Sequence, residues 1–104
     1  MKLIEINLSE VTLDKVKSLC ISLSERYDGC TIYKTIGYRS EGSYLFEEPS
    51  EDIKKEQGYG LKVLTEEEDL NRIEKILRTQ LKGTQIKWVQ VVSYEITTNH
   101  LEMV

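Results

Sequence analysis

The sequence predicts one α+β domain of the ferredoxin-like βαββαβ type: a four-stranded antiparallel sheet with two helices on one face and a long connection between the second and third strands. Three observations lead to this prediction. The 104 residues are the size of one domain. Two stretches carry apolar residues at helical spacing, and four others alternate as strands do. Their order along the chain makes the split-βαβ arrangement the natural solution.

The first strand and helix are predicted within residues 1–29. Residues 2–8 alternate in polarity and are rich in β-branched side chains. Ser9 and Thr12 offer N-cap oxygens to a helix over 13–27, and Gly29 is expected to take the left-handed conformation at its end. The apolar stripe of this helix comprises Leu13, Val16, Leu19, Cys20, Leu23 and Tyr27.

The second strand is predicted over 30–36, with Ile32 and Ile36 on one face and Tyr33 and Thr35 on the other. Residues 39–57 form the least regular stretch, which holds the only proline and a dense set of acids. A short strand is possible within it over 43–47. Connections of this length in compact domains are often functional.

The remaining elements are a third strand over 59–65, a second helix and a last strand over 85–97. Residues 65–68 fit the capping-box pattern before an apolar stripe that runs from Leu70 to Leu81, and Gly83 closes the helix. The last strand places two sets of apolar residues on opposite faces, one of Ile86, Trp88, Val92, Tyr94 and Ile96, the other of Val89 and Val91.

Apolar residues on both faces of several strands indicate that the face without helices is covered. A second copy of the chain would cover it, and closed cyclic assembly is the simplest way. A domain of this size also builds a large pocket more readily between subunits than inside one.

Composition excludes several function classes. A formal net charge of −4 and a pI near 5.1 disfavour a general nucleic-acid or anionic-membrane binder. No apolar run is long enough to span a bilayer, and the N-terminus lacks the apolar region of a signal peptide, so a cytoplasmic location is expected.

Cys20 and Cys30 are too few for a disulfide scaffold, and packing is preferred to redox chemistry for both. His100, the only histidine, is expected to be an exposed tail residue.

Tyrosines cluster around the long connection, and they suit a contact surface because each joins a flat apolar ring to one polar group. Lys34 and Arg39 lie in the same stretch and suit an anionic ligand or the acids of a partner. The other interpretation is that the tyrosines only seal the sheet in an oligomer. Glu47 and Glu48 are candidates for a carboxylate pair, or for an ordinary solvated loop.

The segment 28–38, Asp-Gly-Cys-Thr-Ile-Tyr-Lys-Thr-Ile-Gly-Tyr, resembles a pattern in small trimeric PII-like proteins with the ferredoxin fold. An Asp-Gly-x-Thr run opens the second strand there, a Gly-aromatic pair follows, and a Glu lies across the hairpin as Glu47 does here. The resemblance implies a trimer in which the connection is the interaction element and small ligands bind between subunits. The nucleotide-binding glycine and basic residues of PII signal proteins are missing, which argues against ATP or 2-oxoglutarate sensing.

The sequence therefore predicts a non-enzymatic regulatory module that acts as a homotrimer and binds a small anionic ligand or a protein through residues 37–60. One version is a mobile-element or phage inhibitor that sequesters a host protein or signalling molecule. The alternatives are a small enzyme with interface sites built on Tyr33, Arg39 and Glu48, and a structural subunit of a larger complex. No catalytic residue, metal ligand or cofactor is identified. The predicted binding residues are Tyr33, Lys34, Gly37, Tyr38, Arg39, Tyr44, Glu47, Glu48 and Tyr59.

Overall fold

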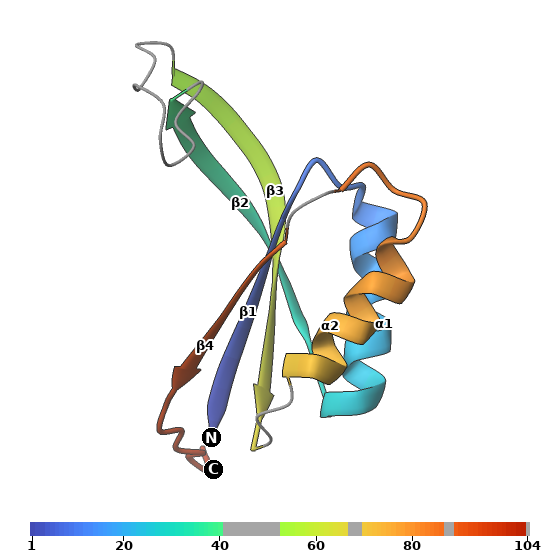
Figure 1. The fold of residues 1–104 in the computed structure, drawn as a ribbon. Helices are drawn as coiled ribbons and strands as arrows, with labels where there is room; N and C mark the ends of the chain where they lie inside the picture. Colours follow the sequence, from blue (N-terminus) through green and yellow to red (C-terminus); the bar gives the residue numbers. More distant parts are fainter. Residues whose placement is uncertain (41–52, 67–69, 87–88, 104) are drawn as a thin grey trace.

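The computed structural model describes residues 1–40, 53–66, 70–86 and 89–103, apart from some side chains near the ends of β2 and β3. The chain forms two layers, a four-stranded sheet and a pair of helices that cover one of its faces (Figure 1). The elements are β1 (Lys2–Ser9), α1 (Leu13–Tyr27), β2 (Thr31–Ser40), β3 (Ile53–Thr65), α2 (Leu70–Leu81) and β4 (Gln90–Glu95). This order confirms the predicted βαββαβ fold.

The strands lie in the order β2-β3-β1-β4, and every neighbouring pair is antiparallel. β1 is central, with Ile6 opposite Leu61 of β3 and opposite Val91 of β4. Residues directly opposite one another share a face of the sheet, so these three side chains point the same way. Two helices can therefore cover all the strands from one side.

The core lies between this face and the helices. Ile4, Ile6 and Leu8 of β1 are buried there together with Leu61 and Val63 of β3. The helices contribute buried residues at the predicted spacing, namely Val16, Leu19, Leu23 and Tyr27 of α1 and Ile73 and Leu77 of α2. None of the helices in the described part of the chain has the length and apolar character needed to cross a bilayer.

The structure confirms the predicted N-cap of α1 but corrects the residue that ends the helix. Thr12 is the N-cap, and its hydroxyl accepts a hydrogen bond from the Lys15 amide at 3.3 Å. The left-handed residue at the other end is Asp28, with φ 62° and ψ 14°, while Gly29 has φ 156°. The expectation for Gly29 was wrong by one residue, because Asp also tolerates this conformation and the residue directly after Tyr27 adopts it.

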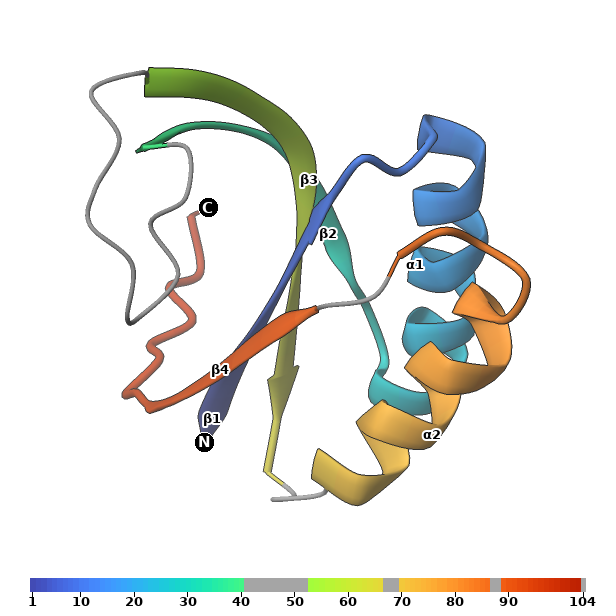
Figure 2. The ribbon, with the colours of Figure 1, turned by 45° about the horizontal axis from the view of Figure 1, so that its top comes forward.

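β2 and β3 form a hairpin longer than predicted. Ladder pairing continues to Ser40 opposite Ile53, so residues 37–40 and 53–58 belong to strands and not to an irregular connection. The outer part of this hairpin extends beyond the helices and curves away from them (Figure 2). Ile36 is 61% exposed for this reason, although it lies on the helix-side face. The possible strand at 43–47 lies outside the described residues.

β4 is shorter than the predicted strand over 85–97. Within β4 the two faces are as predicted: Val91 shares the helix side with Ile6, whereas Val92 and Tyr94 lie opposite Glu5 and Leu3 on the other face. Ile86 lies before the strand and lines the same groove as Val89 and Val91, so its predicted place beside Val92 was wrong. Trp88, part of the capping-box segment (residues 67 and 68) and residues 41–52 are outside the part of the chain that the structure describes.

Candidate functional site: the open face of the sheet

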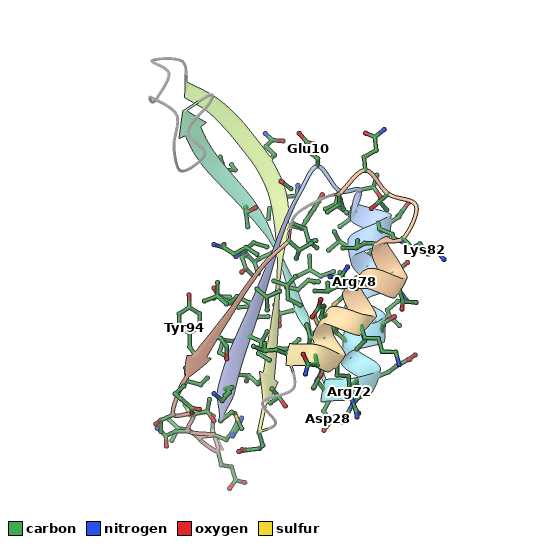
Figure 3. The ribbon with its side chains drawn as sticks, in the orientation of Figure 1. Glu10, Asp28, Arg72, Arg78, Lys82 and Tyr94 are labelled. Atoms are coloured by element: carbon green, nitrogen blue, oxygen red, sulfur yellow. The ribbon has the colours of Figure 1, made fainter. Side chains whose placement is uncertain are left out.

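The face of the sheet that turns away from the helices carries the best-defined cluster of polar side chains. Odd-numbered positions of β1 lie on this face, because Ile4, Ile6 and Leu8 point into the core. The register then places one residue from each other strand nearby: Tyr33 of β2, Lys62 of β3 and Tyr94 of β4. Tyr94 points away from both helices (Figure 3).

Glu5 is the centre of the cluster. One of its carboxylate oxygens lies 3.7 Å from the Lys62 ammonium nitrogen. The other accepts a long hydrogen bond of 3.5 Å from the Tyr94 hydroxyl. The Lys62 ammonium also lies over the ring of Tyr33, 4.8 Å from its centroid. Side chains of all four strands are thus linked by polar or cation–π contacts that centre on one carboxylate.

The Tyr33 ring packs closely against β3, because its neighbour across the ladder has no side chain. It lies opposite Gly60 of β3, and a β-carbon at position 60 would overlap the tyrosine ring. Burial raises the pKa of the Tyr33 phenol above its ordinary value, and the negative charge of Glu5 and the nearby Tyr94 raise it further. Tyr33 is therefore a neutral hydrogen-bonding group at physiological pH.

Apolar side chains flank the polar cluster. Leu3 lies opposite Leu64 of β3 and Tyr94 of β4 on the same face. Leu64 is 43% exposed and Tyr94 is 45% exposed in the single chain. Exposed apolar side chains around a paired charge resemble the composition of a protein contact surface. Within the described ranges, no three His, Cys, Asp or Glu side chains gather as a metal site would require.

The structure divides the predicted binding residues between the two faces of the sheet. Tyr33 lies on the open face, whereas Lys34 and Tyr59 lie directly opposite one another on the helix-side face. Tyr59 packs against the core there. The structure therefore separates Tyr33 from the other two.

The remaining predicted residues lie along or beyond the outer hairpin. Gly37, Tyr38 and Arg39 belong to β2, opposite Glu56, Lys55 and Lys54. Tyr44, Glu47 and Glu48 lie outside the described residues, so their role as binding residues stays a prediction.

Sequence reasoning missed Glu5, Lys62 and Tyr94. Each lies at an alternating position of a predicted strand, so the period indicated a face for each one. The alternation does not show which residues of neighbouring strands lie opposite one another. This register brings residues 5, 33, 62 and 94 to one place. A charged residue within the apolar run of β1 was the one local signal available.

A hollow of about 580 Å³ lies beside this face, where α1 ends and β2 begins. Cys30, Thr31, Asp28 and Lys62 line it, and so does His100 of the C-terminal tail. Its walls also include Arg26, whose guanidinium lies 5.4 Å from the centroid of the Tyr27 ring. A second groove of about 570 Å³ runs between α2 and β4 and is mostly apolar.

Comparison with known proteins gives matches in structure only. No protein family's sequence profile matches the chain, and no curated protein matches it. Among solved structures, the periplasmic divalent cation tolerance protein CutA from Archaeoglobus fulgidus has a TM-score of 0.65 and 14% identity over 96% of this chain and 88% of its own.

Two further structures are similar. CutA1 from Pyrococcus horikoshii has a TM-score of 0.64 and 8% identity over 96% of this chain and 87% of its own. CutA from Synechococcus elongatus has a TM-score of 0.56 and 15% identity over 89% of this chain and 78% of its own. At such low identity the likeness concerns the backbone alone, and it confirms that this chain has the PII-like ferredoxin fold of the CutA proteins, as the resemblance in residues 28–38 predicted.

Proposed function

We propose that the protein is a non-enzymatic binding module that works as a homotrimer, with the open face of each sheet covered by neighbouring copies. The observation that carries the proposal is the composition of this face. Leu3, Leu64 and Tyr94 offer apolar area to a partner, while the Glu5–Lys62 pair is already neutralised within the chain. Burying a paired charge costs far less free energy than burying a single one.

The projecting hairpin supports the same proposal. The outer parts of β2 and β3 pair with each other beyond the reach of the helices (Figure 1). A two-stranded ribbon is only marginally stable in water unless something packs against it. Ile36 is exposed on this ribbon and gives a neighbouring copy an apolar contact point.

The structural relatives support the trimer as well. The resemblance of residues 28–38 to small PII-like proteins implies a trimer, and this chain matches the fold of two CutA structures over 96% of its length. The A. fulgidus relative is described as periplasmic, so the cytoplasmic location expected from the sequence stays a prediction. We place the binding of a small anionic ligand or a protein at the outer hairpin, residues 37–60, as the resemblance to PII-like proteins implies.

Native mass spectrometry on gently purified protein tests the assembly. We expect a trimer for the unaltered chain and monomers for Leu64→Glu, because a carboxylate would then be buried without a partner at the interface. Ile21→Glu is the matched control, since Ile21 is 61% exposed on α1 at the opposite side of the sheet. An unaltered chain that is monomeric at micromolar concentration would contradict the proposal.

The role of the hairpin has a separate test. Ser40 and Ile53 are direct ladder partners, so an Asn-Gly turn can replace residues 41–52 without shifting the register. We expect this variant to fold and to remain trimeric, but to lose any mass or protein that co-purifies with the unaltered chain. Retention of that ligand or partner would show that residues 41–52 are not needed to bind it.

A further inference from the structure

The two cysteines of the chain come together in the fold. Cys20 lies on α1, and Cys30 lies just before the first residue of β2. The Cys20 thiol donates a hydrogen bond to the Cys30 carbonyl oxygen, with 3.4 Å between sulfur and oxygen. An interaction with the Cys20 thiol is also among the causes that raise the pKa of the Cys30 thiol. Both side chains are half-buried and both are free thiols.

We propose that Cys20 and Cys30 are a modification site, at which a small-molecule disulfide such as oxidised glutathione converts the two thiols into an intramolecular disulfide. The bond would connect α1 to the start of β2 and close the short loop around the helix end. This inference does not depend on the proposed function, because it concerns two thiols within one copy of the chain.

The reaction proceeds by two exchanges. The thiolate of one cysteine attacks a sulfur of oxidised glutathione, forms a mixed disulfide and releases one reduced glutathione. The second cysteine then attacks the protein sulfur of the mixed disulfide and releases the other. In sum the protein loses two hydrogens and two electrons, and one oxidised glutathione becomes two reduced ones.

The surroundings favour an order for these steps. Burial raises the pKa of the Cys30 thiol to about 12, with smaller contributions from its hydrogen bond to Cys20 and from the charge of that neighbour. Cys30 is almost wholly protonated at neutral pH, so we assign the first attack to Cys20 and the ring closure to Cys30. The hollow of about 580 Å³ at the end of α1 reaches the pair at Cys30. Cys20 does not line this hollow but is itself only half-buried, so a small disulfide approaches it beside Cys30.

Two unrelated thiols could also react with oxidised glutathione if they were accessible. Only two thiols that lie close together can go on to bond to each other. Two cysteines that cannot meet would each keep a glutathione or would form dimers between chains. Two cysteines that the native fold holds together displace both glutathiones. The product distribution therefore reports the geometry directly.

The experiment treats the reduced full-length protein with excess oxidised glutathione under anaerobic conditions, followed by alkylation and intact-mass measurement. We expect a loss of about 2 Da, no retained glutathione and no free thiol. Tryptic digestion without reductant should then give peptide 18–26 joined to peptide 27–34. A stable glutathione adduct on the unaltered chain, or a disulfide-linked dimer, would overturn the proposal.

Cys20→Ser and Cys30→Ser serve as matched controls, because each leaves one thiol that can keep a glutathione but cannot release it.

The rate of ring closure in the unaltered chain should continue to rise above pH 9, since the closing thiol is the one with the raised pKa. A closure rate that is independent of pH would contradict the assigned order.

Thermal unfolding adds a readout of the native geometry. If the native fold brings the thiols together, the oxidised form should melt roughly 5–15 °C above the reduced form, because the bond restricts the unfolded chain. A lower melting temperature for the oxidised form would mean that the thiols meet only in a distorted state, and would overturn the proposal.

Discussion

The ring of Tyr33 lies over the backbone of Gly60 on the neighbouring strand, where a β-carbon at position 60 would overlap it. This contact lets Tyr33 lie flat against the sheet and brings its ring beneath the Lys62 ammonium. The position of one aromatic ring on the open face thus depends on a residue without a side chain.

Three glycine-to-alanine variants should differ in stability in a fixed order. Gly58→Ala should cost more than about 2 kcal/mol, because its β-carbon would meet the Leu8 carbonyl of the rigid backbone. Gly60→Ala should cost about 1 kcal/mol, since the Tyr33 ring can move aside. Gly37→Ala has open space and should be neutral or stabilising by up to about 1 kcal/mol. Urea denaturation measures all three.

A double-mutant cycle checks the reason for the Gly60 effect. In a Tyr33→Ala background, Gly60→Ala should lose most of its cost, because the overlapping ring is gone. An unchanged cost in that background would show that the backbone at position 60, and not the ring, opposes a side chain.

The Tyr33 phenol should titrate above the ordinary value of a tyrosine, because burial and the charge of Glu5 raise its pKa. Its folded-state pKa is raised, so its contribution to stability is complete below the unfolded-state pKa of about 10 and is lost as pH rises through the folded-state value. Glu5→Gln should lower the pKa of Tyr33, because it removes a nearby negative charge. NMR titration with labelled tyrosine measures both values, and Tyr33→Phe identifies the signal.

Truncation of two isoleucines of the same size should have very different costs. Ile6→Ala should cost about 2–5 kcal/mol, because Ile6 is fully buried between the sheet and the helices. Ile21→Ala should stay within about 0.5 kcal/mol, because Ile21 is exposed on the outer side of α1. Chemical denaturation of both variants at two protein concentrations separates burial from any effect of assembly, because only the latter depends on concentration. Equal costs would contradict the placement of the core.

The end of α1 gives a prediction about backbone conformation. Asp28 has a positive φ, so Asp28→Gly should stabilise the fold by about 0.5–1 kcal/mol, whereas Asp28→Val should destabilise it by about 1–2 kcal/mol. Melting temperatures of the two variants measure the difference. A stabilising Asp28→Val would contradict the left-handed assignment.

The fold could be predicted from the sequence wherever a face is buried against the core. The stripe from Leu13 to Tyr27 predicted α1 at its observed bounds, because the spacing of its apolar residues follows the helical period. The outer hairpin was not predictable in the same way. Residues 53–58 contain no alternating apolar pattern, since no core lies beneath them, and pairing with β2 holds them in the strand.

The candidate site was predicted less well for a related reason. Tyr33 and Tyr59 were grouped together because both flank the long connection, but Tyr33 pairs with Gly60 and Tyr59 with Lys34. A shift of one residue along a strand moves a side chain to the opposite face. The sequence shows which residues alternate, but only strand pairing shows that Glu5, Tyr33, Lys62 and Tyr94 share one face.

The strand order β2-β3-β1-β4 leaves two different strands at the two edges of the sheet. A contact between one copy's β2 edge and the next copy's β4 edge would be head-to-tail, so each added copy would present a fresh edge. Only the angle between successive copies decides whether the chain of copies closes into a ring or grows into a filament. Substitutions that change the curvature of the hairpin, far from any buried residue, would therefore affect solubility more than folding.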